Sequence, residues 1–279
     1  MHIGVGLPNT VAGLNGAQIN AWLRQIDQGP FSSAAVLDRL VYDSYEPMTT
    51  LAAGAALTTR IRLATMIVIG PLRNSAILAK MAATINALSG GRFSLGVALG
   101  ARVDDYQAAG VSLQGRGELF TRQLAALREQ WDAADLGPHA VGRPELLVGG
   151  LTDVTFSRVA RYADGYMHNG GPPQIFARMA ERALSAWTEA GRPARPRLWG
   201  MGYFSLGDEA AAEAGRAYLR DYYAFTGPFA ERIAQGLLTT PQAITQYMRG
   251  YAEAGCDELV LFPVSGDLEH LDKLAHVVG

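Results

Sequence analysis

The sequence has little cysteine, no long apolar run and almost no excess charge. Cys256 is the only cysteine among the 279 residues, so the chain cannot form an intrachain disulfide. The longest apolar stretches, such as Ile61 to Gly70, are interrupted by Arg62 and are too short to span a bilayer. The first residues, MHIGVGLP, carry no positively charged leader and do not resemble a signal peptide. We therefore expect a cytoplasmic protein with no membrane partner.

The charge balance and the missing motifs exclude several functions. The chain has 24 basic and 26 acidic side chains, which gives no reason to expect nucleic acid as a partner. No H-E-x-x-H, C-x-x-C or phosphate-binding P-loop motif is present, so a metal site and nucleotide hydrolysis have no support. No G-x-S-x-G motif indicates a serine hydrolase.

What the sequence does contain is an alternation of short β-rich runs and helical patterns. Hydrophobic residues make up 49% of the chain and charged residues 18%, which suffices for one large core. The helical patterns include one at Ser75 to Leu88, which the Gly90-Gly91 pair ends. The predicted strands are Ile3 to Pro8, Ala34 to Leu37, Ile61 to Ile69, Arg92 to Leu99, Glu145 to Val148, Gly165 to His168, Arg197 to Leu206 and Glu258 to Phe262.

Eight strands, each followed by a helix, predict a single-domain (β/α)₈ TIM barrel, an α/β fold, over residues 1–279. A short helical insertion, Pro228 to Leu238, is expected after the seventh strand, and Asp135 to Pro144 reads as a loop. The alternative architecture is a doubly wound open sheet. No G-x-G-x-x-G follows the first strand, where a nucleotide-binding open sheet would most often carry it.

In such a barrel the chemistry is expected where strands end and loops begin. The fifth strand ends in LLVGGLTD, where Gly149 and Gly150 leave backbone N–H groups open and Thr152 or Asp153 could cap the next helix. This pattern is typical of a phosphate site, and the alternative is simply a tight strand-to-helix turn.

Charged and polar residues close three other predicted strands. Asp38 and Arg39 follow the second strand, Arg102 follows the fourth and His168 ends the sixth. The plain interpretation of the charged residues is a surface ion pair or a polar loop. The imidazole of His168 could serve as an acid or base, or only fill a polar rim.

Taken in order, four segments resemble the bacterial luciferase-like family, which includes flavin-dependent monooxygenases and oxidoreductases that use the deazaflavin coenzyme F420. The most specific is RIRLATMIVIGPLRNSAILAKMAATINALSGGRFSLGVALG, which begins at Arg60. The others are DRLVYDSYEPMTTLAA, LLVGGLTDVTFSRVARYADGY and TPQAITQYMRGYAEAGCDELVLFP, so the resemblance covers nearly the whole chain.

The resemblance implies a cofactor site. Members of the family often carry a non-proline cis peptide under the flavin ring, and here it would be the Met66-Ile67 bond or its immediate neighbour. Asp38 matches an acidic residue at the end of the second strand. The matching cofactor-binding positions are Met66, Ile67, Ala98, Gly100, Arg102, Gly149, Gly150, Leu151 and Thr152.

One departure bears on mechanism. Family members often have Asp-His at the end of the second strand, whereas Arg39 holds the histidine position here. Arg39 would then bind an anion or polarise the substrate, and His168 is the remaining acid–base candidate. The resemblance implies F420-dependent hydride transfer to or from a small organic substrate by a homodimer that pairs through the helix Leu51 to Leu57. The alternatives are an FMN-dependent monooxygenase that uses O₂ and a cofactor-binding or pathway-partner protein that has lost catalysis.

Overall fold

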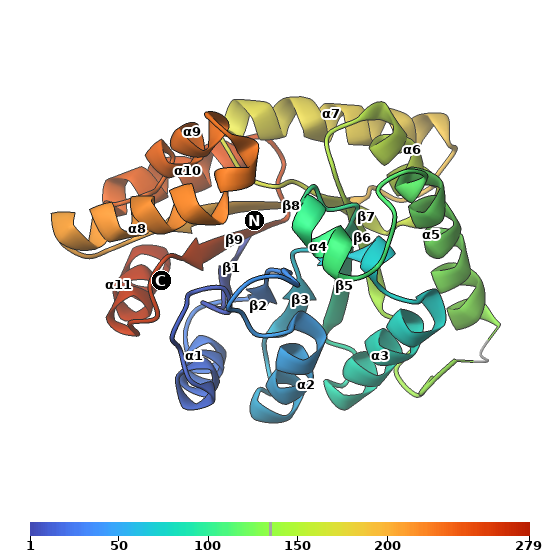
Figure 1. Ribbon diagram of the computed structural model, residues 1–279, viewed down its shortest axis with the longest axis horizontal. Helices are drawn as coiled ribbons and strands as arrows, with labels where there is room; N and C mark the ends of the chain where they lie inside the picture. Colours follow the sequence, from blue (N-terminus) through green and yellow to red (C-terminus); the bar gives the residue numbers. More distant parts are fainter. Residues whose placement is uncertain (134–135) are drawn as a thin grey trace.

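The computed structural model describes residues 1–133 and 136–279, and its parallel strands form a ring surrounded by helices (Figure 1). The strands are β1 His2–Gly6, β2 Ser33–Val36, β3 Arg62–Thr65, β4 Val68–Ile69, β5 Phe93–Ala98, β6 Glu145–Gly149, β7 Gly165–Met167, β8 Arg197–Phe204 and β9 Glu258–Pro263. The helices are α1 Gly16–Gln28, α2 Pro47–Leu57, α3 Ser75–Leu88, α4 Val103–Ala108, α5 Arg116–Asp132, α6 Asp153–Tyr162, α7 Pro173–Glu189, α8 Glu209–Tyr222, α9 Phe229–Gln235, α10 Pro241–Glu253 and α11 Glu269–Val278. Two short 3₁₀ helices, η1 Gly70–Leu72 and η2 Ala224–Thr226, complete the chain.

The sheet closes on itself. Its strand order is β3-β2-β1-β9-β8-β7-β6-β5-β4, and β3 also pairs with β5, so that no edge remains open. Every pairing is parallel. Because β3 and β4 are two parts of one interrupted strand, the ring has eight strand positions, and the predicted (β/α)₈ barrel is confirmed.

The third strand is where the structure corrects the sequence analysis. The expected continuous strand Ile61 to Ile69 is wrong, since Met66 and Ile67 separate β3 from β4. The Met66–Ile67 peptide bond is cis, as predicted. The Thr65 hydroxyl donates to the carbonyl oxygen of Gly96 at 2.8 Å and accepts from the Gly96 N–H at 2.9 Å. Hydrogen bonds from the Thr65 side chain therefore replace the backbone hydrogen bonds between the two strands at this point. Backbone pairing with β5 resumes in β4, from Val68 onward.

The core has two layers because the strands are buried on both faces. One layer lies between the barrel and its helices and includes Trp22, Phe120, Phe176 and Tyr251. The other fills the barrel interior with residues such as Ala64, Leu147, Met167, Trp199 and Val260. Residues on alternate sides of the same strand join different layers, which explains why the strand segments are nearly uniform in hydrophobicity.

Local capping explains where several helices begin. The Asn74 side chain accepts from the N–H groups of Ala76 and Ile77 and starts α3, and Thr240 with Pro241 starts α10. The predicted insertion is present as α9, between α8 and α10. Of the predicted loop 135–144, the first residue lies outside the described residues, and the remainder forms no helix or strand.

Within the described ranges, no helix is both long enough and apolar enough to cross a membrane.

Gly96 offers a test of the β3–β5 contact. A Cβ at this position would clash with the carbonyl oxygen of Thr65 and with the Met167 side chain. Because the first of these is backbone, we expect Gly96→Ala to lower the free energy of unfolding by about 1–3 kcal/mol. Urea unfolding measures this loss. Gly16→Ala is the matched control, since nothing lies within 4 Å of a Cβ there. Equal stability of the two variants would contradict the account.

Candidate functional site

A cavity of about 450 Å³ opens over the carboxyl ends of the strands. This is the end of a barrel where loops from several strands can surround one ligand. All nine of the cofactor-binding residues expected from the sequence line the cavity, as do Asp38 and His168, whereas Arg39 does not. The remaining lining residues are Leu37, Ile69, Leu99, Ala101, Arg116, Phe120, Thr155, Arg158, Met167, Asn169, Met201, Tyr222, Tyr223 and Phe225.

The floor of the cavity is apolar. It is formed by side chains from the strand ends, among them Met66, Ile67, Met167 and Met201. A Cβ at Gly149 would lie 3.4 Å from the Ile67 side chain and 3.5 Å from Ala98, so the absence of a side chain at Gly149 keeps this part of the floor low. The floor therefore suits a flat ring rather than a charged group.

The turn at the end of β6 keeps backbone N–H groups open. Gly150 has φ +143°, a conformation that favours glycine, and a Cβ there would lie 2.5 Å from Thr155 Oγ1. Helix α6 follows, and no side chain caps its first turn at Thr152. An uncapped helix start behind two glycines is a suitable place for an anion.

Two arginines that the sequence analysis did not identify line the same cavity as this turn. Arg158 is held by its bonds to the Gly117 carbonyl oxygen, at 2.7 Å, and to Thr121 Oγ1, at 3.0 Å. Arg116 also lines the cavity, and its buried Nη1 has no hydrogen-bond partner among the described residues. No local motif marks either residue, because Arg158 lies within α6 and Arg116 is the first residue of α5.

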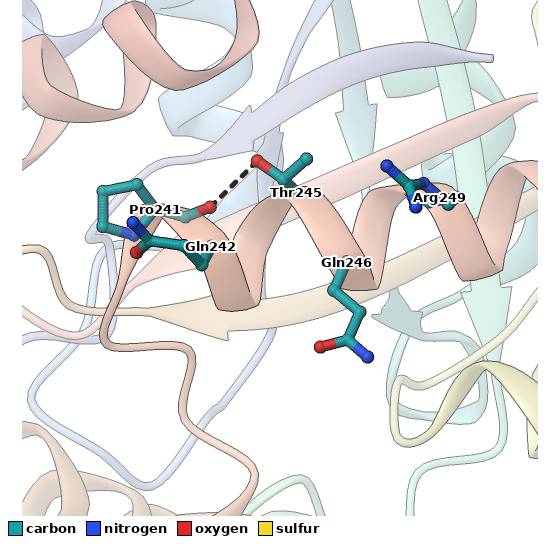
Figure 2. A pocket seen from close by; sticks show the side chains of 5 residues that line it. All are labelled: Pro241, Gln242, Thr245, Gln246 and Arg249. Atoms are coloured by element: carbon teal, nitrogen blue, oxygen red, sulfur yellow. Dashed lines mark hydrogen bonds between the residues drawn. The ribbon is translucent and has the colours of Figure 1, made fainter.

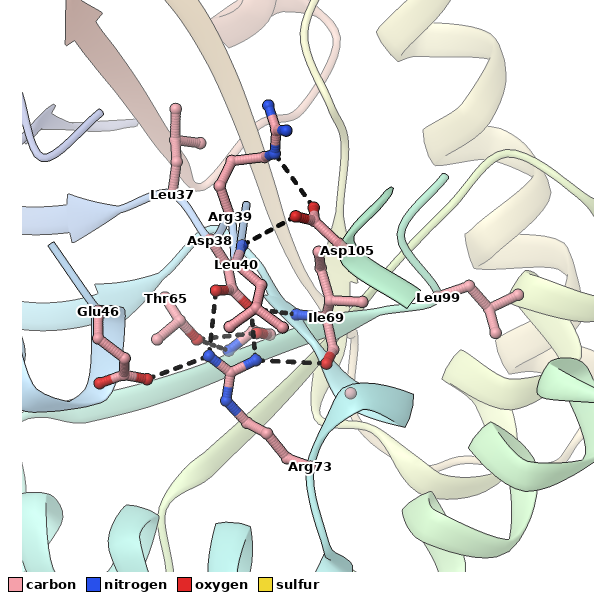
Figure 3. Close-up of polar contacts among 12 residues, drawn as sticks. Leu37, Asp38, Arg39, Leu40, Glu46, Thr65, Ile69, Arg73, Leu99 and Asp105 are labelled. Carbon is pink, nitrogen blue, oxygen red and sulfur yellow. Dashed lines mark hydrogen bonds and ion pairs between the residues drawn. The ribbon is translucent and has the colours of Figure 1, made fainter. Parts of the chain in front are cut away.

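Asp38 is the centre of a buried ion-pair network (Figure 3). Its carboxylate accepts from the Ile69 N–H at 2.8 Å and from both terminal nitrogens of Arg73, at 2.6 and 3.0 Å. Arg73 in turn reaches Glu46, the N-cap of α2, at 3.0 Å. Burial raises the pKa of the Asp38 carboxyl, while Arg73 and the Ile69 N–H oppose this increase. Asp38 therefore joins three segments at the cavity wall.

The guanidinium of Arg39 is engaged by protein groups instead of facing the cavity. It donates to Asp105 at 3.1 Å and to Asp104 at 3.0 Å (Figure 3 shows the first contact). Asp105 also accepts from the backbone N–H groups of Leu40 and Val41. The geometry thus assigns Arg39 to the packing of the loop after β2 against α4.

Arg102, the N-cap residue of α4, lies in the cavity wall. Only 8% of it is exposed, and it donates to the carbonyl oxygen of Tyr222. Its guanidinium lies 4.6 Å from the ring centre of Tyr222 and 4.2 Å from that of Phe225. Burial lowers its pKa, and it has no ion-pair partner among the residues described. A desolvated cation of this kind favours an anionic ligand.

Aromatic residues from the end of α8 and the segment after it complete this wall. Tyr222, Tyr223 and Phe225 line the cavity and pack against one another. The sequence analysis gave these residues no role. The contact between Arg102 and Tyr222 joins positions 120 residues apart, so no local pattern could have indicated it.

His168 borders the cavity but lies among aromatic rings. Its ring centre is 5.7 Å from that of Phe176 and 6.3 Å from that of Tyr166. It is 1% exposed, and neither ring nitrogen has a partner among the described residues. Burial lowers the pKa of His168 to about 4, so the imidazole is neutral at pH 7.

A second hollow lies on the outside of the molecule along α10 (Figure 2). Its five lining residues all come from that one helix, and the Thr245 hydroxyl is bonded to the Pro241 carbonyl oxygen. It contains no strand end and no carboxylate. In the part of the chain that the structure describes, no group of three His, Cys, Asp or Glu side chains is arranged to hold a metal.

The closed ring of strands defines a (β/α)₈ barrel protein with a cavity at the carboxyl ends of the strands. A family model described as luciferase-like monooxygenase matches residues 1–279. The chain belongs to this family, which confirms the resemblance stated above.

Curated relatives match part of the chain. An uncharacterized protein of Mycobacterium tuberculosis is 32% identical over 161 residues, which cover 53% of this chain and 56% of the relative. Pyrimidine monooxygenase RutA of Variovorax paradoxus is 29% identical over 191 residues, which cover 60% and 50%. The chain therefore spans a little over half of the first relative and half of the second.

Solved structures show the same fold. An F420-dependent secondary alcohol dehydrogenase in complex with an F420-acetone adduct has a TM-score of 0.83 and 17% identity, with 99% of this chain and 98% of the other covered. A type II Baeyer–Villiger monooxygenase constituent from Pseudomonas putida, in complex with FMN, has a TM-score of 0.75 and 16% identity, with 100% and 96% covered. Monooxygenase RslO1 from Streptomyces bottropensis has a TM-score of 0.81 and 21% identity over 99% and 97%.

The burial of His168 predicts acid sensitivity. Its folded pKa of about 4 lies below the ordinary value of 6.5, so the unfolded chain binds the proton more readily. The resulting stability is full above pH 6.5 and is lost as the pH falls toward 4, with a loss of about 2 kcal/mol by pH 5.

Urea unfolding at pH 7 and pH 5 tests this expectation. The difference between the two pH values should be about 2 kcal/mol smaller in His168→Gln than in the wild type. His2→Gln, which changes an exposed histidine, should retain the wild-type difference. A His168→Gln variant with unchanged pH dependence would show that His168 is not buried as a neutral group.

Proposed function

We propose that the cavity binds a flavin-type cofactor, F420 in preference to FMN, and that the protein transfers hydride to or from a small organic substrate. The observation that carries this proposal is the open Gly149–Thr152 turn in a cavity that Arg116 also lines, since the buried Nη1 of Arg116 lacks a partner among the described residues. The turn and Arg116 would hold a phosphate, and the apolar floor would hold the ring. A bound deazaflavin supplies or accepts the hydride.

The residues of the chain itself would bind and orient the cofactor and the substrate, and they would exclude water from the cavity. Ala98, Gly100 and Leu151 would cover the cofactor from the loops after β5 and β6, with Met66 and Ile67 beneath it. Asp38 would fix the wall next to Ile69, and Arg39 would act as a positioning residue through Asp104 and Asp105. His168 is neutral at pH 7 with both ring nitrogens unengaged by the described residues, which suits a proton donor or acceptor.

Arg102 supports F420 over FMN. It is a buried cation at the mouth with no carboxylate partner in the described residues, and the deazaflavin carries a longer anionic tail than FMN. The alternative, an FMN-dependent monooxygenase, is supported by the relatives that are named monooxygenases. A protein without catalysis is supported by Arg39, which stands in place of the usual histidine and is bound to two aspartates.

Fluorescence titration of the cofactor-free protein distinguishes these functions. We expect F420 to bind at least tenfold more tightly than FMN, a difference of roughly 1.4 kcal/mol. Gly150→Asp should weaken both cofactors, since it adds bulk and negative charge at the turn. Arg102→Ala should weaken F420 more than FMN, while the exposed Arg161→Ala should change neither. Tight FMN binding coupled to oxygen consumption would favour the monooxygenase, and binding without turnover would favour the third alternative.

We further propose a homodimer formed through α2 and α3. Ala53 and Ala56 of α2 are exposed small residues that allow close packing, and Ile77 and Leu88 of the neighbouring α3 are 60% and 63% exposed. Large apolar side chains on adjacent helices are typical of an interface between subunits.

Light scattering at micromolar concentration should give the mass of a dimer. The double variant Ile77→Lys/Leu88→Lys should give a monomer, because two charges would be buried in the interface. Phe229→Lys changes an exposed apolar residue of α9 and should leave the dimer intact. A monomer mass for the wild type would refute the proposal.

A further inference from the structure

A buried histidine of the C-terminal helix holds the chain at the point where it leaves β8. His270 lies in the first turn of α11, and only 7% of it is exposed. Its Nδ1 accepts a hydrogen bond from the backbone N–H of Leu206 at 3.0 Å. Leu206 follows the end of β8 by two residues, where the chain turns toward α8. One buried hydrogen bond therefore joins this junction to α11.

Residues 205–240, the β8–α10 connection, begin and end at this same junction. The Ser205 N–H donates to the Leu238 carbonyl oxygen at 2.9 Å, and the Leu238 N–H donates to the Tyr203 carbonyl oxygen at 2.9 Å. Between these two ends lie α8, η2 and α9. The connection contributes three aromatic residues to the lining of the cavity, Tyr222, Tyr223 and Phe225. The junction therefore positions the aromatic part of the cavity wall.

Only a neutral imidazole can make the bond to Leu206. The backbone N–H is a donor, so Nδ1 of His270 must offer its lone pair, and the single ring proton must lie on Nε2. An imidazolium carries a proton on both nitrogens. Protonation thus removes the acceptor and leaves two buried donors facing each other across 3.0 Å.

The charged groups around the ring do not prevent its loss of charge in the folded protein. Burial is the main cause that lowers the pKa of His270, and Lys273 lowers it further, whereas Asp267 and Glu269 oppose the decrease. On the facing connection, the Asp208 carboxylate is engaged as the N-cap of α8, where it accepts from a backbone N–H at 2.9 Å. The closed junction therefore contains a neutral His270 at pH 7.

We propose that His270 is an acid-sensitive switch whose protonation releases Leu206, loosens the β8–α10 connection and opens the aromatic part of the cavity wall. The bond is fully present above the ordinary pKa of 6.5, and it is lost as the pH falls below that value, because the open form binds the proton more readily than the closed form. The switch requires no cofactor, so it does not rest on the proposed function.

Amide hydrogen exchange of the full-length protein without cofactor tests this switch. Exchange rates are measured by NMR at pH 7 and pH 5 and divided by the intrinsic rate of an open amide at each pH. The Leu206 amide reports the junction, and the Thr226 amide, bonded to the Tyr223 carbonyl oxygen at 2.9 Å, reports the wall. The Leu95 amide in β5 is the internal reference, because it reports unfolding of the whole barrel, including the effect of His168.

In the wild type, we expect the protection of Leu206 and Thr226, relative to Leu95, to fall by about threefold to tenfold between pH 7 and pH 5. This is the effect expected for the loss of one hydrogen bond. His270→Asn places a carbonyl oxygen where Nδ1 lies and cannot be protonated, so the relative protection should stay high at both pH values. His270→Phe removes the acceptor and should give the low value at both.

His276→Asn is the matched control, because it changes an exposed histidine of the same helix and should keep the wild-type fall. Circular dichroism confirms that each variant is folded before exchange is measured. A wild type with equal relative protection at the two pH values would overturn the proposal. A fall that persists in His270→Asn would also overturn it, since another group would then be titrating. So would a fall at Leu206 without one at Thr226, because the wall would then not follow the junction.

Discussion

The buried carboxylate of Asp38 holds together the part of the barrel on which the candidate site is built. It accepts a hydrogen bond from the Ile69 N–H just beyond the interruption in the third strand. It also forms an ion pair with Arg73, which in turn pairs with Glu46, the N-cap residue of α2. Removing one partner of such a pair leaves an uncompensated buried charge, which typically costs 3–5 kcal/mol. The position of Met66 and Ile67 on the cavity floor therefore depends on an ion pair that lies beside them.

Above this floor, the cavity lining has two parts that differ in chemistry. At the end of β6, open backbone N–H groups, Arg116 and Arg158 create positive potential next to an apolar surface. Another part of the lining consists of Arg102, the N-cap residue of α4, and the aromatic residues Tyr222, Tyr223 and Phe225 from the end of α8 and the segment after it. The first part is suited to a phosphate, and the second to the tail of a cofactor or the body of a substrate.

The sequence allowed the barrel and the turn at Gly149 and Gly150 to be predicted from local patterns. The floor residues Met66 and Ile67 were expected only from the resemblance to the family, since the apolar third strand by itself indicates no more than core. The interruption after Thr65 was not placed in the strand assignment, since it depends on a hydroxyl that bonds Gly96 across the sheet. The partners of Arg39 and the aromatic wall were missed for the same reason, as their contacts join segments 65 to 120 residues apart.

The central claim is that a flavin-type cofactor lies on the Met66–Ile67 floor with its phosphate at the Gly149–Thr152 turn. A crystal structure of the protein with bound F420 or FMN tests this most directly. The account predicts that phosphate oxygens lie within hydrogen-bond distance of backbone N–H groups in the turn and of Arg116 Nη1. A phosphate more than a hydrogen-bond length from the turn would contradict it.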